Sequence, residues 1–285
     1  MGDIGRRLGS KVAKSLMSES SATILKTAKA NKTSLSKALD GTMKKSHDMK
    51  IFGLGTLATM ASRQRYARFT GTMYAVYRTM EEELDASAAI SEPVGIVWNP
   101  YGSVLRRSER LHQDLLDVQV SSSPALDLTN ESLWSPATTA YVHSIREAGQ
   151  HDRDNKGARL LGHLYCRYFA DLFGGSVLAT PYRVALGLPA NTPRHYEFDF
   201  SSVDVDGSGG SRRALVEGVY SSINKAATRM TTDQEVQVAA ESMLAFQHNI
   251  DVYSEDGKLY TDSVRGGLKV VTGLVADQLR FGTTN

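Results

Sequence analysis

The sequence LLGHLYCRYFADLFGG, residues 160–175, combines a helical pattern of apolar residues with two consecutive glycines. Apolar residues recur every four positions from Leu164 to Leu172, which places them on one face of a helix. Ala170 and Gly174 share another face, which is almost free of side chains. Two glycines in a helix cost about 1 kcal/mol each relative to alanine, so they are tolerated where the backbone bends or approaches a ligand. An ordinary kink or close helix packing predicts the same residues.

A second predicted helix leads to the histidine His47. Ser34 or Ser36 can cap this helix, and apolar residues recur every four positions from Leu35 to Met43, so the next residue of the stripe is His47. A histidine on an apolar stripe can be a packed core residue or a metal ligand. There is no HExxH, no CxxC and no second histidine three or four residues away, which argues against a zinc site made by protein alone. A single axial nitrogen suits haem, because the porphyrin supplies the other four ligands.

The rest of the chain is also predicted to be helical. Residues 66–84 have aromatic, methionine and leucine side chains at alternating spacings of three and four, and a serine followed by proline begins a helix expected over 135–149. Thr232 and Glu235 have the spacing of a capping box. Phe52–Thr59, which contains two glycines, is expected to be a loosely structured connection. Because no alternating strand pattern is present, we predict an all-α fold.

Composition excludes several classes of protein. The 285 residues are 41% hydrophobic and 22% charged, as in soluble globular proteins, and the net charge of +2 does not require a nucleic-acid partner. The single cysteine, Cys166, cannot form an intrachain disulfide and favours a reducing compartment. The most apolar run, Leu268–Val275, is too short to span a bilayer, so we expect a soluble, intracellular protein without a transmembrane anchor.

The chain divides into three predicted regions. Residues 1–33 form a basic N-terminal leader or arm, 34–260 a helical domain, and 261–285 a C-terminal extension. From Met1 to Lys37 there are eight lysines and arginines and two acidic residues. This composition fits a transit peptide and a solvated arm equally well, so the location is the cytoplasm, or a mitochondrion or plastid if the leader targets the protein.

These patterns resemble the haem oxygenase family. Leu35–Phe52 looks like the proximal helix of these proteins, and Gly162–Gly175 looks like their distal helix. Three further blocks follow the family order, namely Tyr74–Glu81, Arg110–Leu115 and Ala245–Ile250. Five blocks in the correct order over more than three quarters of the chain argue against a chance match. The resemblance implies a single-domain bundle that holds haem between a proximal and a kinked distal helix.

The resemblance also implies roles for individual residues. His47 would be the proximal iron ligand, and Lys44, one turn earlier, would face a haem propionate. Ala170 and Gly174 would let the distal backbone lie against the porphyrin, while Asp171 would hold a water network that delivers a proton to iron-bound oxygen. Further contacts to the haem would come from Tyr165, Gly175 and Phe246.

Each of these roles has a simpler alternative. Lys44 could be a solvated surface lysine, and Asp171 a helix-surface aspartate paired with Arg167 four residues earlier. Ordinary core packing predicts the same residues at Tyr165 and Phe246.

Three positions depart from the family pattern. Ala170 replaces a glycine of many members, although plant-type members resemble this chain in having alanine there. Asp40 replaces the first lysine of the proximal helix. Ser221 replaces the basic residue that usually follows a tyrosine on the propionate-facing helix, although Lys225 or Arg229 lies within two turns.

The resemblance implies an oxidoreductase of the monooxygenase type. It would convert haem, O2 and external electrons to biliverdin, carbon monoxide and ferrous iron, with haem as both cofactor and substrate. The chain has no dinucleotide-binding fingerprint and no cluster cysteines, so a flavoprotein reductase or ferredoxin must supply the electrons. We expect this partner to dock on a helix surface that includes Arg106, Arg107 and Arg110.

Two other functions remain open. The first is an inactive haem oxygenase-like protein that carries haem or serves as a scaffold, and Ser221 favours it. The second is a cofactor-independent or thiaminase-like helical enzyme in which His47 is merely packed. The Asp171–Gly175 pattern argues against the second.

Overall fold

The computed structural model describes residues 34–46, 49–118, 130–201, 203, 210–255 and 257–281. All regular structure in these residues is helical, so the predicted all-α fold is confirmed. The helices are α2 (Ser34–Ser46), α3 (Met49–Thr59), α4 (Arg63–Ala88), α5 (Glu92–Leu105), α6 (Ser108–Val118), α7 (Pro136–Asn155), α8 (Leu160–Ala170), α9 (Ser176–Leu186), α10 (Arg212–Ala227), α11 (Thr232–Ser254) and α12 (Leu259–Phe281). Shorter turns are η1 (Glu131–Leu133), η2 (Asp171–Gly175) and η3 (Arg194–Tyr196). The predicted leader, residues 1–33, lies outside the described part of the chain.

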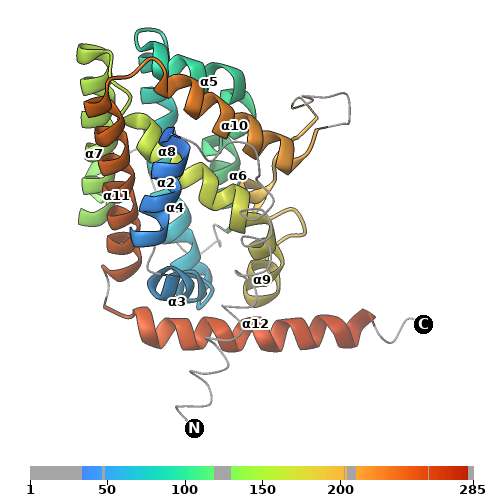
Figure 1. Cartoon of the computed structure of the whole chain (residues 1–285). Coiled ribbons are helices and arrows are strands. Elements are labelled where there is room, and N and C mark those ends of the chain that lie inside the picture. The colour runs from blue at the N-terminus through green and yellow to red at the C-terminus, as the bar shows by residue number, and fades with distance from the viewer. Residues whose placement is uncertain are drawn as a thin grey trace.

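The helices form a bundle around α8 (Figure 1). Helices α2, α4, α5, α7 and α11 all contact α8, and every residue from Leu160 to Phe169 is buried. Each large apolar side chain buried in this way contributes about 1.5–3 kcal/mol. The position of α8 is therefore fixed on all sides, and so is the η2 turn that continues it.

Helix α12 lies across one end of the bundle, below α3 and α9 in Figure 1. It contains the apolar run Leu268–Val275. Among the described helices, α12 included, we find none that combines the length and the hydropathy needed to cross a bilayer.

Two predicted boundaries of helices were wrong. Helix α7 begins after the N-cap Ser135 as predicted, but it continues through Gly149 to Asn155. A Cβ at Gly149 would lie 2.1 Å from the carboxylate of Glu83, so this glycine allows close packing with α4 and does not end the helix. The segment expected to be a connection, Phe52–Thr59, belongs to α3, because packing against α12 outweighs the low helix propensity of its glycines.

The capping box of α11 lies one residue before its predicted position. Thr231 is the N-cap, with extended backbone, and its hydroxyl accepts the backbone N–H of Gln234. The Gln234 side chain accepts the backbone N–H of Thr231 in return. Both threonines have a suitable acceptor three residues later, so the sequence pattern alone did not distinguish the two registers.

Candidate functional site

The distal segment predicted to be kinked contains a π-helical turn. Helix α8 passes directly into η2, which has the wider π-helical pattern, and then into α9. The two glycines of η2 face different surroundings. Within the part of the chain that the structure describes, a Cβ built on Gly174 would meet no atom within 4 Å, whereas one on Gly175 would lie 2.4 Å from Cδ1 of Tyr196. Gly174 therefore borders open space, and Gly175 allows η3 to pack against η2.

Ala170 borders the same open side of the helix. It is exposed, although the ten residues that precede it in α8 are all buried. Ala170 and Gly174 are four residues apart, close to one helical turn. The sequence predicted a helix face free of side chains at these two residues, and the structure has it.

Helix α2 runs in the same direction as its neighbour α11. Ser34 at the start of α2 donates a hydrogen bond to Glu235, and the hydroxyl of Thr42 lies 3.2 Å from that of Ser242. Residue numbers thus increase together along the two helices.

Helix α8 also runs in this direction. His163 Nε2 lies 3.0 Å from Glu241 Oε1, and further along Arg167 donates to Asn249 Oδ1 at 2.5 Å. Since α2 and α8 both run with α11, they run in the same sense as each other.

Asp40 joins α2 to α8 and α10. Its carboxylate is buried and accepts hydrogen bonds from the hydroxyls of Tyr165 at 2.6 Å and Tyr220 at 2.7 Å. Burial raises the pKa of both tyrosines, and the negative charge of Asp40 raises it further, so both remain protonated donors. The residue that departs from the family pattern therefore holds three helices together.

This bond also sets the level of α2 along α8. At about 1.5 Å per residue, the last residue of α2, Ser46, lies about 9 Å beyond Asp40, and Ala170 lies about 7.5 Å beyond Tyr165. Each of these distances runs along the axis of its own helix. His47 follows Ser46 immediately, but it lies outside the described residues, as does the side chain of Lys44.

Asp171 belongs to a buried polar cluster. Its carboxylate accepts a hydrogen bond from the hydroxyl of Tyr77, and its Oδ1 lies 3.9 Å from Arg167 Nη2. Arg167 Nη1 bonds to Asn249, whereas its Nε is buried and has no hydrogen-bond partner among the described residues. Burial raises the pKa of Tyr77 far above its usual value; Arg167 partly offsets this and Asp171 adds to it, so Tyr77 stays protonated. Because Asp171 is buried, its interpretation as a surface residue is wrong, although Arg167 is its neighbour as that interpretation expected.

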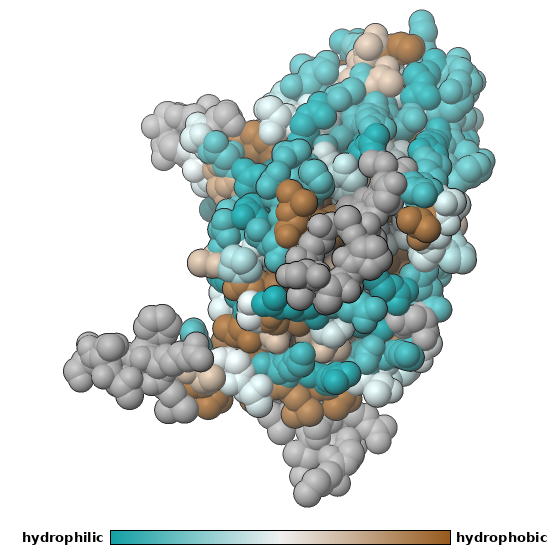
Figure 2. Space-filling view, turned by 180° about the vertical axis from the view of Figure 1, so that it is seen from behind, coloured by the Kyte–Doolittle hydropathy of each residue, from teal (hydrophilic) through white to brown (hydrophobic). Residues whose placement is uncertain are grey.

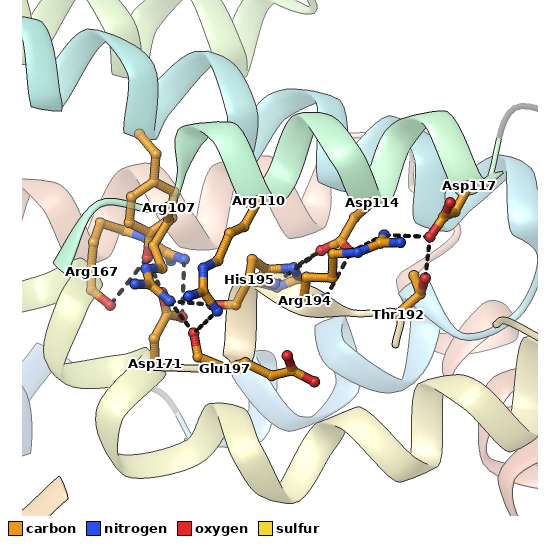
Figure 3. A network of polar contacts seen from close by, with 11 residues as sticks. Arg107, Arg110, Asp114, Asp117, Arg167, Asp171, Thr192, Arg194, His195 and Glu197 are labelled. Carbon is orange, nitrogen blue, oxygen red and sulfur yellow. Dashed lines mark hydrogen bonds and ion pairs between the residues drawn. The ribbon is translucent and has the colours of Figure 1, made fainter. Parts of the chain in front are cut away.

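Arg107 is buried, so its predicted place on a wet basic face is wrong. Its guanidinium donates to the carbonyls of Val104, Leu105, His195 and Glu197 and lies 4.0 Å from the ring centre of Phe198 (Figure 3). The physical reason is its place between α5 and α6. The last carbonyls of a helix lack intrahelical donors, and Arg107 supplies them for α5. Arg106 and Arg110 remain at the surface, bonded to Asp85 and to the carbonyl of Glu197.

Asp114 holds η3 beside the distal turn. Its buried carboxylate accepts the backbone N–H groups of Arg194 and His195 and lies 2.7 Å from His195 Nδ1 (Figure 3). The next residue, Tyr196, packs under Gly175. The wall behind η2 is therefore fixed by hydrogen bonds to α6.

Comparison with known proteins identifies the family. The sequence profile of the heme oxygenase family matches residues 33–255, more than three quarters of the chain. The chain belongs to the haem oxygenase family. Among curated relatives, heme oxygenase of Pyropia yezoensis is 26% identical over 83% of this chain and 88% of its own length. Heme oxygenase 1 of Rattus norvegicus is 26% identical over 70% of this chain and 63% of its own length, so the chain spans less than two thirds of that relative.

Solved structures share the fold. Heme oxygenase-1 of Synechocystis, crystallised with heme, has a TM-score of 0.61 and 24% identity, covering 87% of this chain and 100% of the other. Heme oxygenase 2 of Chlamydomonas reinhardtii, crystallised without heme, has a TM-score of 0.64 and 20% identity. The match covers 78% of this chain and 96% of the other. The single-domain haem oxygenase-like bundle predicted from sequence is confirmed.

The predicted site residues that the structure describes lie in two settings. Ala170, Asp171 and Gly174 lie on one continuous distal segment. Tyr165 and Phe246 are both buried in the core; Tyr165 bonds to Asp40, and the ring of Phe246 lies 6.3 Å from that of Phe52.

Sequence reasoning assigned no role to two partners in the Asp171 cluster. Tyr77 and Asn249 both stood in blocks that resemble haem oxygenases. Their presence in those blocks was the available signal, but contacts 94 and 82 residues apart are not visible in local spacing.

Proposed function

We propose that this chain binds haem against the open face of Ala170 and Gly174 and degrades it oxidatively. The products would be biliverdin, carbon monoxide and ferrous iron, formed with O2 and electrons from a separate protein. The observation that carries the proposal is the open face itself. A flat porphyrin can approach a helix backbone where no side chain projects, and a Cβ added to Gly174 would have no atom of the described residues within 4 Å.

The predicted site residues would hold the haem. His47 directly follows α2 in the sequence, and by the resemblance to haem oxygenases one of its ring nitrogens would hold the iron. Lys44, one turn earlier, would face a propionate. Gly175, Tyr165 and Phe246 remain predicted contacts. Bound haem would supply the iron that binds and activates O2.

The Asp171 cluster would control protons on the distal side. Tyr77 is kept protonated and donates to Asp171, so this carboxylate stays fixed beside the open face. Arg167 Nε is a buried donor to which no described residue offers an acceptor, and a water molecule next to Asp171 would satisfy it. We infer that Asp171 orients such a water as the proton donor.

Electrons would reach the site from a flavoprotein reductase or a ferredoxin. With Arg107 buried, the predicted basic docking surface retains only Arg106 and Arg110. A second candidate function, haem binding without turnover, is favoured by Ser221, which is exposed on α10 where relatives of this family usually have a basic residue.

Titration of the purified chain with haemin tests the proposal. We expect a Soret band that changes in His47→Ala and, after addition of ascorbate or a reductase, decays as biliverdin absorbance rises. Asp171→Asn should bind haemin normally and form no biliverdin, whereas the matched surface variant Asp154→Asn should behave as the parent. A stable haem complex that yields no biliverdin would favour the second candidate, and failure to bind haemin would exclude both.

A further inference from the structure

Helix α12 carries an apolar stripe that no described part of the chain covers. Five side chains, each between 41% and 63% exposed, follow one another at spacings of four, four, three and four residues: Tyr260, Val264, Leu268, Val271 and Val275. At 100° per residue they fall within about 80° of the helix circumference and extend for about 22 Å. Figure 2 shows hydrophobic atoms along the lower rim of the molecule, where α12 lies.

The opposite side of α12 is locked to the bundle. Val270 is fully buried, and a Cβ at Gly266 would lie 1.7 Å from the carbonyl oxygen of Leu57 in α3. Two turns later, a Cβ at Gly273 would lie 2.6 Å from the carbonyl oxygen of Val184 in α9. These backbone contacts prevent α12 from rotating its apolar stripe inward.

A cationic edge runs beside the stripe. Arg265 is exposed and Lys269 is half-buried, one helical turn apart, on the side that continues from Leu268. The nearest acid on this edge, Asp262, is neutralised by Arg65 at 2.7 Å. Asp277 lies on the other side of the helix. Around the helix, Arg265 lies about 60° and Lys269 about 100° beyond Leu268, so two cations follow the apolar stripe on one side.

We propose that α12 binds the surface of anionic membranes, with its axis in the plane of the bilayer. The stripe would enter the boundary between headgroups and acyl chains, and Arg265 and Lys269 would meet the lipid phosphates. An amphipathic helix with cations along its apolar face is suited to this interface. A second copy of the chain fits less well, because the stripe exposes on the order of 500 Å², below the roughly 800 Å² per partner of a stable interface.

Vesicle flotation with the full chain tests this proposal. We expect the chain to float with vesicles of 70% phosphatidylcholine and 30% phosphatidylserine and to bind pure phosphatidylcholine much less. Leu268→Glu should abolish flotation. Val236→Glu is the matched control, since Val236 is 63% exposed on α11, and it should float as the parent does. Arg265→Gln with Lys269→Gln should weaken binding to the anionic vesicles about 25-fold, five-fold for each charge at 1 kcal/mol.

The following outcomes would overturn the proposal that α12 binds membranes. If the parent floats with neither vesicle, or if Val236→Glu fails as Leu268→Glu does, α12 is not a lipid-binding helix. If the parent is a dimer by light scattering and Leu268→Glu makes it monomeric without any vesicle binding, the stripe binds a second copy. Far-ultraviolet circular dichroism and thermal unfolding verify that every variant is folded.

Discussion

Alanine at Gly174 and alanine at Gly175 should change the protein in opposite ways, although the two glycines are adjacent in η2. A Cβ on Gly174 would meet none of the described residues within 4 Å, so the added methyl group would enter open space. A Cβ on Gly175 would lie 2.4 Å from the ring of Tyr196. That ring is held between His195 and Tyr182, with centroid distances of 4.0 Å and 6.1 Å, so it has little freedom to move.

The magnitudes follow from these contacts. Gly174→Ala should stabilise the haem-free protein by about 0.5–1 kcal/mol, the usual gain of alanine over glycine in a helix. Overpacking costs about 1–3 kcal/mol, and the fixed ring of Tyr196 favours the upper end, so Gly175→Ala should lose about 2 kcal/mol net. For a domain of this size 1 kcal/mol corresponds to roughly 2–4 °C, so the melting temperatures should move apart by several degrees.

Thermal unfolding of the haem-free Gly174→Ala and Gly175→Ala variants measures their change in stability. Haemin titration of Gly174→Leu measures whether haem needs the open face. The leucine would fill the open face without touching the core, so haemin should bind about ten-fold more weakly or worse, a loss of at least about 1.4 kcal/mol. If Gly174→Ala lowers the melting temperature as Gly175→Ala does, the space beside Gly174 is not open. If Gly174→Leu is stable and binds haemin as the parent does, haem does not lie against η2.

Three further variants test the buried polar groups. Arg107→Lys should lower the free energy of unfolding by about 3 kcal/mol in a denaturant titration, because an ammonium cannot reach the carbonyls that the guanidinium satisfies; an unchanged midpoint would contradict this. Asp40→Asn should lose about 1–3 kcal/mol by weakening two bonds to a charged acceptor, and a loss equal to that of the surface variant Asp233→Asn would refute the three-helix role of Asp40. Burial lowers the pKa of His248, so the unfolded chain binds its proton more readily and the stability of the parent should fall as the pH drops through about 6.5. His248→Phe, which keeps the ring stacked on Tyr141, should make chemical unfolding less dependent on pH between about 7.5 and 5.5, and an unchanged slope would count against this cause.

The sequence was sufficient for features that repeat locally. The four-residue period predicted that α8 is a helix, although the structure buries it on every side up to Phe169, and the spacing of four between Ala170 and Gly174 predicted the open side. A helix face is determined by spacing alone, so no knowledge of neighbouring helices was needed.

Features that depend on distant partners could not be predicted in the same way. Gly174 and Gly175 are equivalent in the sequence pattern, and only the approach of Tyr196 from η3 distinguishes them. Arg107 has the spacing of a surface residue, yet the end of α5 and the η3 segment surround it. Asp40 is an unexplained departure from its family until Tyr165 and Tyr220 are brought to it from other helices.

Buried carboxylates form the frame around the open face. Asp40 holds α2, Asp114 holds the wall behind Gly175, and Asp171 lies within the distal turn, each with hydrogen-bond donors from another segment. Apolar contacts alone are non-directional, so helices that rely on them could slide together and close a space beside the core. A buried carboxylate requires its donors at fixed positions, since losing them leaves an uncompensated charge. Directional bonds therefore set the position of α2 against α8 and α10 and that of η2 against α4, and such bonds can keep a helix face open where hydrophobic packing would close it.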